Sequence, residues 1–202
     1  MRRLFLASAS PRRRQLLAQI GVFPEQLPAP DIDETPLLNE DPGQFVLRLA
    51  QAKAHAGWQR LAVAQHPESV VLAADTTVVL EGCILGKPAD AAEARAMLEK
   101  LSGRQHGVLT AVAVATEQGV NALVASTRVT FLPLEAETLT RYIASGEPFD
   151  KAGGYGIQGF AAAFVSEIRG SYSGVVGLPL AESATLLQQA GVPIWQMEGA
   201  ER

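Results

Sequence analysis

The segment SVVLAADTTVVL, residues 69–80, constrains the fold more than any other part of the sequence. Its β-branched and aliphatic residues predict two buried strands, 70–74 and 76–80, with a turn at Glu81 and Gly82 into a short strand at 83–85. Asp75 is the only charge between the two apolar runs. Burying a carboxylate costs several kcal/mol unless it is paired, bound to a metal or placed beside a cleft. We therefore expect Asp75 to face a functional site, with a structural ion pair or strand-edge turn as the alternative.

Strand and helix patterns alternate along the rest of the chain, which predicts a mixed α/β fold. Its 202 residues, 48% hydrophobic and 19% charged, suit one globular domain, which we place at 1–190 with a frayed tail at 191–202. The predicted strands are 3–7, a hairpin of 108–115 and 122–131, and 162–168. The predicted helices are 11–20, 90–101, 135–144 and 179–190, together with a long helix that begins at residue 42.

Charge and composition exclude several function classes. A net charge of −4 argues against nucleic acid or an anionic membrane as a partner. The single cysteine, Cys83, forms no internal disulfide, and no cysteine and histidine spacing is typical of zinc. The N-terminal MRRLFLASAS has too short an apolar core for a signal peptide, so we expect a cytoplasmic protein.

Three consecutive arginines follow the first predicted strand in LASASPRRRQLL, residues 6–17. Ser10 is a favourable N-cap, so the arginines lie at a helix N-terminus, where positive charge opposes the helix dipole. A bound anion would resolve that conflict. Ser8, Ser10, Arg12 and Arg13 can all donate to one polyanion, whereas we assign Arg14 to solvent. A solvated basic helix face is the equally weighted alternative.

Two lysines and a group of acids can complete a site around Asp75. Lys87 is held between Gly86 and Pro88 in a tight turn, and Lys53 lies beside the apolar face of the long helix that begins at Pro42. A second carboxylate from the proline-rich stretch would give a site for a hard cation; its candidates are Asp31, Asp33 and Glu34. Magnesium typically takes one or two protein carboxylates and leaves its other positions to water and phosphates.

Two glycine-rich stretches follow, DKAGGYGIQG at 150–159 and GSYSGVVGLPL at 170–180. Their glycine content predicts left-handed turns or close approach of the backbone to a ligand. Tyr155 and Gln158 are the side chains available to contact that ligand. The three histidines have no spacing typical of ligation or of a catalytic triad, and we treat them as structural.

Together, LASASPRRRQLL, AADTTVVLEGCILGKP, DKAGGYGIQG and GSYSGVVGLPL closely resemble the Maf family of nucleoside triphosphate pyrophosphatases. The similarity runs from about Leu4 to Ala190, with the motifs in family order. It implies a two-lobed α/β fold around a central cleft, with a mixed sheet and an architecture related to the inosine triphosphate pyrophosphatases. It also implies a homodimer that cleaves a nucleotide between its α and β phosphates with a divalent cation, Mg or Mn.

The resemblance also implies roles for individual residues. Asp75 matches the family's key acid, either the base for the attacking water or a metal ligand, and Glu34 matches a second essential acid. Lys53 and Lys87 match lysines that contact phosphate. The remaining matches are expected to bind substrate: Ser8, Ser10, Arg12, Arg13, Thr76 and Gln158.

Thr76 and DKAGGYGIQG resemble the branch of the family that hydrolyses dTTP and UTP. The amide of Gln158 can turn over and match either uracil or cytosine, so a fixed donor must discriminate between them. Arg13, which only donates, is our candidate for the group facing position 4 of the base, and Thr76 can complete that edge. The alternatives are the same reaction on N7-methylated GTP or another non-standard nucleotide, or a nucleotide-binding regulator of septum formation.

Overall fold

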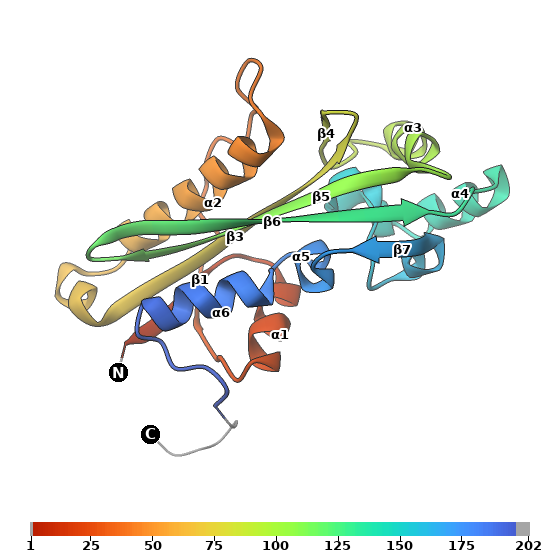
Figure 1. Cartoon of the computed structure of the whole chain (residues 1–202). Coiled ribbons are helices and arrows are strands. Elements are labelled where there is room, and N and C mark those ends of the chain that lie inside the picture. Colours follow the sequence, from red (N-terminus) through yellow and green to blue (C-terminus); the bar gives the residue numbers. More distant parts are fainter. Residues whose placement is uncertain (1, 197–202) are drawn as a thin grey trace.

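A computed structural model describes residues 2–196, except for the side chains of 64 and 65. Its centre is a seven-stranded mixed sheet in the order β2-β1-β3-β5-β6-β7, with β4 pairing with β3 (Figure 1). The strands are β1 (Arg3–Ala7), β2 (Glu25–Leu27), β3 (Ser69–Leu80), β4 (Cys83–Leu85), β5 (Gln105–Thr116), β6 (Gly119–Phe131) and β7 (Val165–Arg169). The α-helices are α1 (Pro11–Gln19), α2 (Pro42–Gln59), α3 (Ala91–Leu101), α4 (Ala136–Ala144), α5 (Tyr172–Val176) and α6 (Leu180–Gln189).

β3 is one continuous strand, so the prediction of two strands around Asp75 was wrong. Asp75 pairs with Ala111 and Thr77 with Leu109 in an unbroken antiparallel ladder with β5. The strand continues because the charge of Asp75 is met by a side chain from another element, described below, and not by a break in the backbone. The predicted mixed sheet and the β5–β6 hairpin are confirmed.

Alternation along β3 divides the core between the two faces of the sheet. Val71 and Ala73 pack with residues of α2, which covers one face. Val70 and Leu72 point the other way and pack with residues of α1 and α6. Figure 1 shows α2 on one side of the sheet and these two helices on the other.

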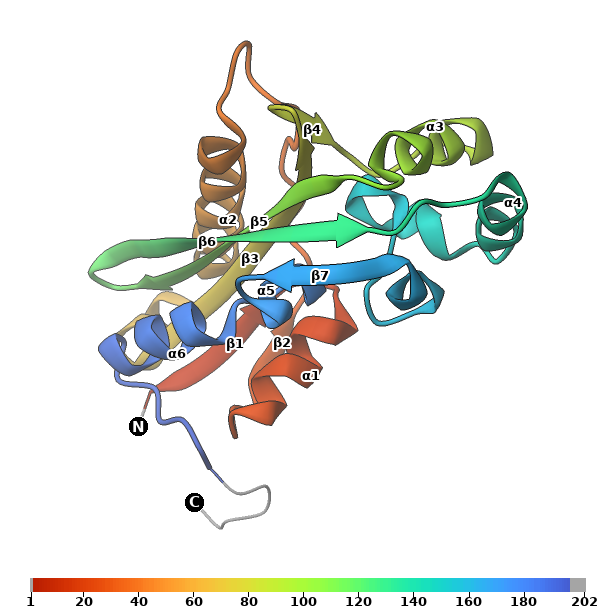
Figure 2. The same cartoon turned by 45° about the vertical axis from the view of Figure 1, so that its right-hand side comes forward.

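The second face carries two separate cores, which gives the protein two lobes. Beyond the cluster under α1 and α6, the same long strands contribute Val78, Val108 and Val129 to a cluster that packs against α3 and α4. Figure 2 shows these two helices at the far end of the strands. Thr76 and Thr110 lie between the two clusters, since they have the same strand parity as the flanking apolar residues. The predicted fold class, an α/β protein of two lobes, is confirmed.

An opening in the sheet lies at the middle of β3. β1 pairs with β3 only as far as Leu72, and β4 begins to pair only at Val78. Between them, residues 73–77 have β5 on one side and no strand partner from the described part of the chain on the other. Side chains from both faces of β3 can therefore reach one space at this edge.

Several short elements differ from the predictions. β2 and α5 were not predicted, since β2 is three residues long and α5 contains Gly174 and two valines, which are poor helix formers. β7 starts at Val165, because the preceding Phe160–Phe164 is a 3-10 helix. Short 3-10 helices also occur at Val63–Glu68, Glu147–Asp150 and Ala152–Gly154.

The expectation of a frayed tail was wrong for residues 191–196. Val192 and Ile194 pack against the core under α1 and α6. The Trp195 backbone N–H also donates to the Ile20 carbonyl at 2.6 Å. Residues 197–202 lie outside the described part of the chain. Among the described residues, no helix has the length and apolarity that crossing a bilayer requires.

Candidate active site

A cleft of about 1000 Å³ opens at the unpaired edge of β3. Its walls are the loop between β1 and α1, the turn after β4, the glycine-rich stretch at 150–159 and the end of α5. This volume is at the upper end of the range of ligand sites, roughly 300–1,000 Å³. Every residue that the sequence analysis assigned to the site lines the cleft: Ser8, Ser10, Arg12, Arg13, Glu34, Lys53, Asp75, Thr76, Lys87 and Gln158.

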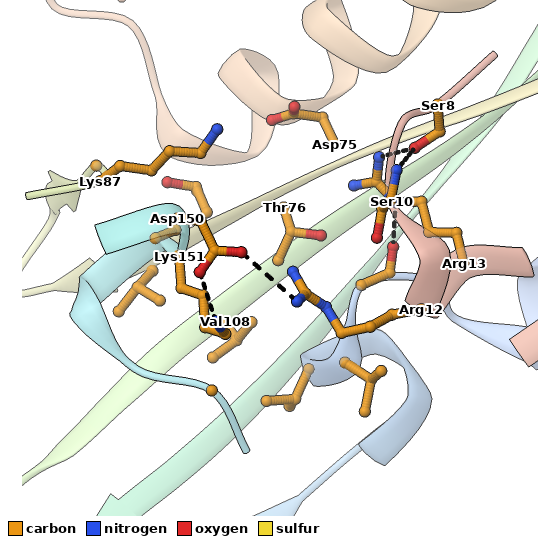
Figure 3. A pocket seen from close by; sticks show the side chains of 18 of the residues that line it. Ser8, Ser10, Arg12, Arg13, Asp75, Thr76, Lys87, Val108, Asp150 and Lys151 are labelled. Atoms are coloured by element: carbon orange, nitrogen blue, oxygen red, sulfur yellow. Dashed lines mark hydrogen bonds and ion pairs between the residues drawn. The ribbon is translucent and has the colours of Figure 1, made fainter. Parts of the chain in front are cut away.

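The loop between β1 and α1 holds Arg13 in a fixed position. Buried Ser8 accepts hydrogen bonds on Oγ from Arg13 Nη1 at 3.0 Å and from the Ser10 backbone N–H at 3.2 Å. Arg13 Nε donates to the Gly177 carbonyl at 2.8 Å. Figure 3 shows Arg13 beside Ser8. Burial lowers the pKa of Arg13, although the charge of Asp75 opposes that shift. The guanidinium is thus anchored at two nitrogens.

Ser10 occupies the N-cap position of α1, as predicted, but its side chain makes no capping hydrogen bond within residues 2–196. Its side chain faces the cleft (Figure 3). An α-helix leaves its first backbone N–H groups without intrahelical partners, and such groups favour a bound anion. The entrance to α1 therefore suits a phosphate group, as the sequence indicated.

Arg12 forms an ion pair with Asp150 at 3.8 Å, which joins the first loop to the glycine-rich stretch. Lys151 lies beside the same carboxylate and donates to it (Figure 3). Arg14 is exposed and does not line the cleft, as predicted. Sequence reasoning missed Asp150 and Lys151, whose signal was a pair of opposite charges at the start of the glycine-rich stretch.

Two carboxylates converge on one lysine at the open edge. Lys53 Nζ lies 2.7 Å from Asp75 Oδ1 and 2.6 Å from Glu34 Oε1. α2 positions this lysine because Asp41 Oδ1 caps its N-terminus, accepting from the Gly43 N–H at 2.8 Å. The prediction that Lys53 reaches a cleft rather than bulk water is confirmed, since its side chain is only 13% exposed.

The two carboxylates differ in their electrostatic environment. Burial raises the pKa of Asp75, and the positive charges of Lys53 and Arg13 offset this only in part. Partial burial also acts to raise the pKa of Glu34, but the hydrogen bond and charge of Lys53 outweigh it and leave that pKa lowered. Glu34 is therefore held as a carboxylate, whereas Asp75 is the better proton acceptor.

Lys87 enters the cleft from the turn after β4. The Gly153 N–H donates to the Gly86 carbonyl at 2.9 Å, which docks the glycine-rich stretch against this turn. Gly153 has φ +69°, and a Cβ there would lie 2.9 Å from Val78 Cβ, so only glycine fits. In Figure 3 the Lys87 amine points toward the side on which Asp75 lies.

Glu147, which sequence reasoning also missed, holds the glycine-rich stretch together. Its carboxylate accepts from the Tyr142 hydroxyl at 2.9 Å and from the Phe160 backbone N–H at 2.9 Å. A Cβ on Gly159 would collide with this carboxylate, which explains that glycine. The Glu147 carboxylate therefore fixes the segment that carries Gln158, while Gln158 itself is exposed at the rim of the cleft.

Tyr155 is anchored from the core side of the same stretch. Its hydroxyl lies 2.7 Å from Nε2 of His106, a histidine that is 3% exposed. Burial lowers the pKa of His106 to about 4, so the ring is neutral at physiological pH. His106 supports the cleft wall from the core, consistent with the structural role expected for the histidines.

The donor set at the open edge fits a divalent cation. Within residues 2–196 no group of three or more histidine, cysteine, aspartate or glutamate side chains is arranged to hold a metal. Asp75 and Glu34 nevertheless both contact one ammonium, so a positive charge already occupies the space between them. Two carboxylates are a typical protein contribution to a magnesium site whose other ligands are water and phosphate.

Carboxylates and basic side chains that converge beside a helix N-terminus form an arrangement that suits a phosphate-bearing ligand. The fold resembles that of a HAM1 protein from Coxiella burnetii, with a TM-score of 0.51 and 18% identity over 94% of this chain and 100% of that one. A family model described as Maf-like protein matches residues 3–190. The chain belongs to the Maf family.

Three relatives that are similar to this chain over almost their whole length share one name. A protein from Aromatoleum aromaticum is 50% identical over 95% of this chain and 97% of its own length. One from Burkholderia pseudomallei is 53% identical over 94% of each chain. One from Nitrosomonas europaea is 49% identical over 95% of this chain and 96% of its own length. All three are named dTTP/UTP pyrophosphatase.

Proposed function

We propose that this protein hydrolyses dTTP and UTP to the nucleoside monophosphate and pyrophosphate. The observation that carries the proposal is the arrangement of Asp75 and Glu34 around Lys53, in a cleft that also contains Lys87 and the arginines of the first loop. The names of relatives at about 50% identity support the same substrates.

In the proposed reaction, a water oxygen attacks the α-phosphorus, and the bond from this phosphorus to the α–β bridging oxygen breaks. The pyrophosphate leaves with the electron pair of that bond, and Asp75 accepts the proton of the water. Burial raises the pKa of Asp75, which makes it a stronger proton acceptor than an ordinary aspartate. Lys53, Lys87 and Arg12 supply positive charge against the phosphates.

Glu34 and Asp75 are the residues that would hold a divalent cation, Mg or Mn. When bound, such a cation neutralises phosphate charge. A carboxylate has two oxygens, so Asp75 can contact a cation through one of them and accept a proton on the other. Homodimer formation and a cytoplasmic location stay predictions.

The direct test is pyrophosphate release by the purified protein from dTTP, UTP, CTP and N7-methylated GTP, with magnesium or manganese. We expect release from dTTP and UTP that stops when the metal is chelated and resumes when it is restored. Release from N7-methylated GTP alone would replace the proposed substrate. If the folded protein released pyrophosphate from none of the four, the nucleotide-binding regulator would become the better interpretation.

Arg13 is expected to contribute to selection of the base. Its guanidinium can only donate hydrogen bonds, so it favours a carbonyl at position 4 over the amino group of cytosine. Arg13→Ala should reduce the preference for UTP over CTP, measured as the ratio of kcat/KM values, by about tenfold. Arg14→Ala, which removes the exposed neighbour, is the control and should leave the ratio unchanged. An unchanged ratio in Arg13→Ala would contradict this role.

A further inference from the structure

A buried threonine lies directly behind Thr76 and is not part of the cleft wall. Thr76 on β3 and Thr110 on β5 are opposite each other in the antiparallel ladder. Thr110 is 1% exposed, and its Oγ1 lies 3.0 Å from Thr76 Oγ1 and 2.8 Å from the carbonyl oxygen of Gly174. Three oxygen atoms thus form a short hydrogen-bonded chain that ends at the cleft.

The chemistry of these three atoms fixes the direction of the chain. A backbone carbonyl can only accept, so the single hydroxyl hydrogen of Thr110 must point to Gly174. The lone pairs of Thr110 then face Thr76, and the Thr76 hydroxyl donates to Thr110. The opposite arrangement would place two oxygen lone pairs against each other at 2.8 Å, in a buried position where water cannot compensate.

Neighbouring hydrogen bonds hold Gly174 in place. Ser171 caps α5, accepting the Gly174 N–H on its Oγ at 3.0 Å. The Ser171 backbone N–H in turn donates to Oγ1 of Thr127 on β6 at 2.9 Å. Gly174, whose carbonyl determines the direction of this hydrogen-bonded chain, is therefore tied to the sheet.

We propose that Thr110 is a positioning residue for base selection, because it fixes the Thr76 hydroxyl as a hydrogen-bond acceptor toward the cleft. This inference rests on the proposed function and adds to it the group that recognises N3 of the base. With its own hydrogen directed to Thr110, Thr76 presents only lone pairs to a ligand. The matching ligand group is an N–H donor.

Arg13 supplies the complementary donor beside this acceptor. A Cβ placed on Gly177 would lie 3.8 Å from Arg13 Nε and 3.9 Å from Thr76 Oγ1, so both groups border the same residue. Figure 3 shows both side chains in the cleft. Among the described contacts Arg13 donates through Nε and Nη1, which leaves Nη2 for a ligand.

A fixed donor next to a fixed acceptor distinguishes the two kinds of pyrimidine. Uracil and thymine carry a carbonyl at position 4 and an N–H at position 3, which match Arg13 and Thr76 respectively. Cytosine in the same orientation places an amino group against the guanidinium and the N3 lone pair against the Thr76 lone pairs. Gln158 cannot make this distinction, since its amide presents either polarity.

The experiment compares kcat/KM for UTP and CTP in Thr110→Val, which removes the hydroxyl at nearly constant volume. We expect the preference for UTP to fall about tenfold, because Thr76 becomes free to rotate and donate to N3 of cytosine. Thr110→Ser, which retains the hydroxyl, should restore the preference. Thr116→Val changes a buried threonine at the C-terminal end of β5; it is the matched control and should leave the preference unchanged.

The same substitution in a protein that lacks the Thr76 hydroxyl separates this role from a general packing effect. If Thr110 acts through Thr76, Thr110→Val should not change the UTP to CTP ratio further in a Thr76→Val protein. Thr110→Ala gives the same comparison should the valine variant fold poorly. Equal ratios in the wild type and in folded variants without the Thr110 hydroxyl would overturn the inference while leaving the proposed function intact. Absence of UTP hydrolysis by the wild type would instead overturn the proposed function.

Discussion

Asp75→Asn is expected to lower kcat/KM for UTP by about 1000-fold, the middle of the range for loss of a general base. Asparagine has nearly the same shape but accepts no proton at neutral pH. Pyrophosphate release at saturating metal and several UTP concentrations measures the effect. Asp31→Asn, the same change at an exposed carboxylate that does not line the cleft, is the control and should retain full activity.

The same substitution should leave the melting temperature unchanged or raise it. Because burial raises the pKa of Asp75 in the folded state, ionising this group costs folding free energy as pH rises through that pKa. Asparagine avoids that cost at pH 7–8, and Lys53 keeps its ion pair with Glu34. A melting temperature several degrees below that of the wild type would instead assign Asp75 a mainly structural role.

Lys53→Met is expected to remove activity and, in contrast, to destabilise the fold by about 3 kcal/mol, a typical cost of breaking a buried ion pair from one side. Asp75 would lose its ammonium partner, so its pKa would rise further. The free energy of unfolding should therefore recover as pH falls and this carboxyl takes up a proton. Urea unfolding at pH 5, 7 and 8.5 measures the loss of stability and its recovery at low pH.

Two further variants define the origin of that destabilisation. Lys100→Met removes an exposed lysine of α3 and should change stability by less than about 0.5 kcal/mol. Adding Asp75→Asn to Lys53→Met should restore part of the lost stability, because the unpaired buried charge is gone. Equal destabilisation in the single and double variants would mean that the Lys53 side chain acts through packing alone.

Much of the site could be predicted because each group disturbs its local sequence. Asp75 interrupts a run of strand residues, the arginines oppose a helix dipole, and Lys87 stands in a rigid turn. Such conflicts are visible in a single sequence because local preference and residue chemistry disagree. The alternation of helices and strands predicted the α/β class for a similar reason.

The residues that were missed act through contacts that only the folded chain creates. Thr110 acquires a role because the β3–β5 register places it opposite Thr76 and because Gly174, far along the chain, returns to it. Glu147 and Asp150 likewise act through Phe160 and Arg12, which lie on other segments. Strand register and contacts between segments distant in sequence are set by tertiary packing, which local sequence patterns do not encode.

The opening beside residues 73–77 also bears on how the protein avoids pairing of this strand edge with a strand from another chain. An unpaired strand edge is a template on which a foreign strand can add, and long, flat edges of this kind lead to aggregation. Here β1 and β4 occupy the same edge immediately before and after the opening. An incoming strand would have to displace one of them before it could pair over more than a few residues. The opening thus admits a small ligand beside residues 75–77 but is too short for a strand of another polypeptide to pair with.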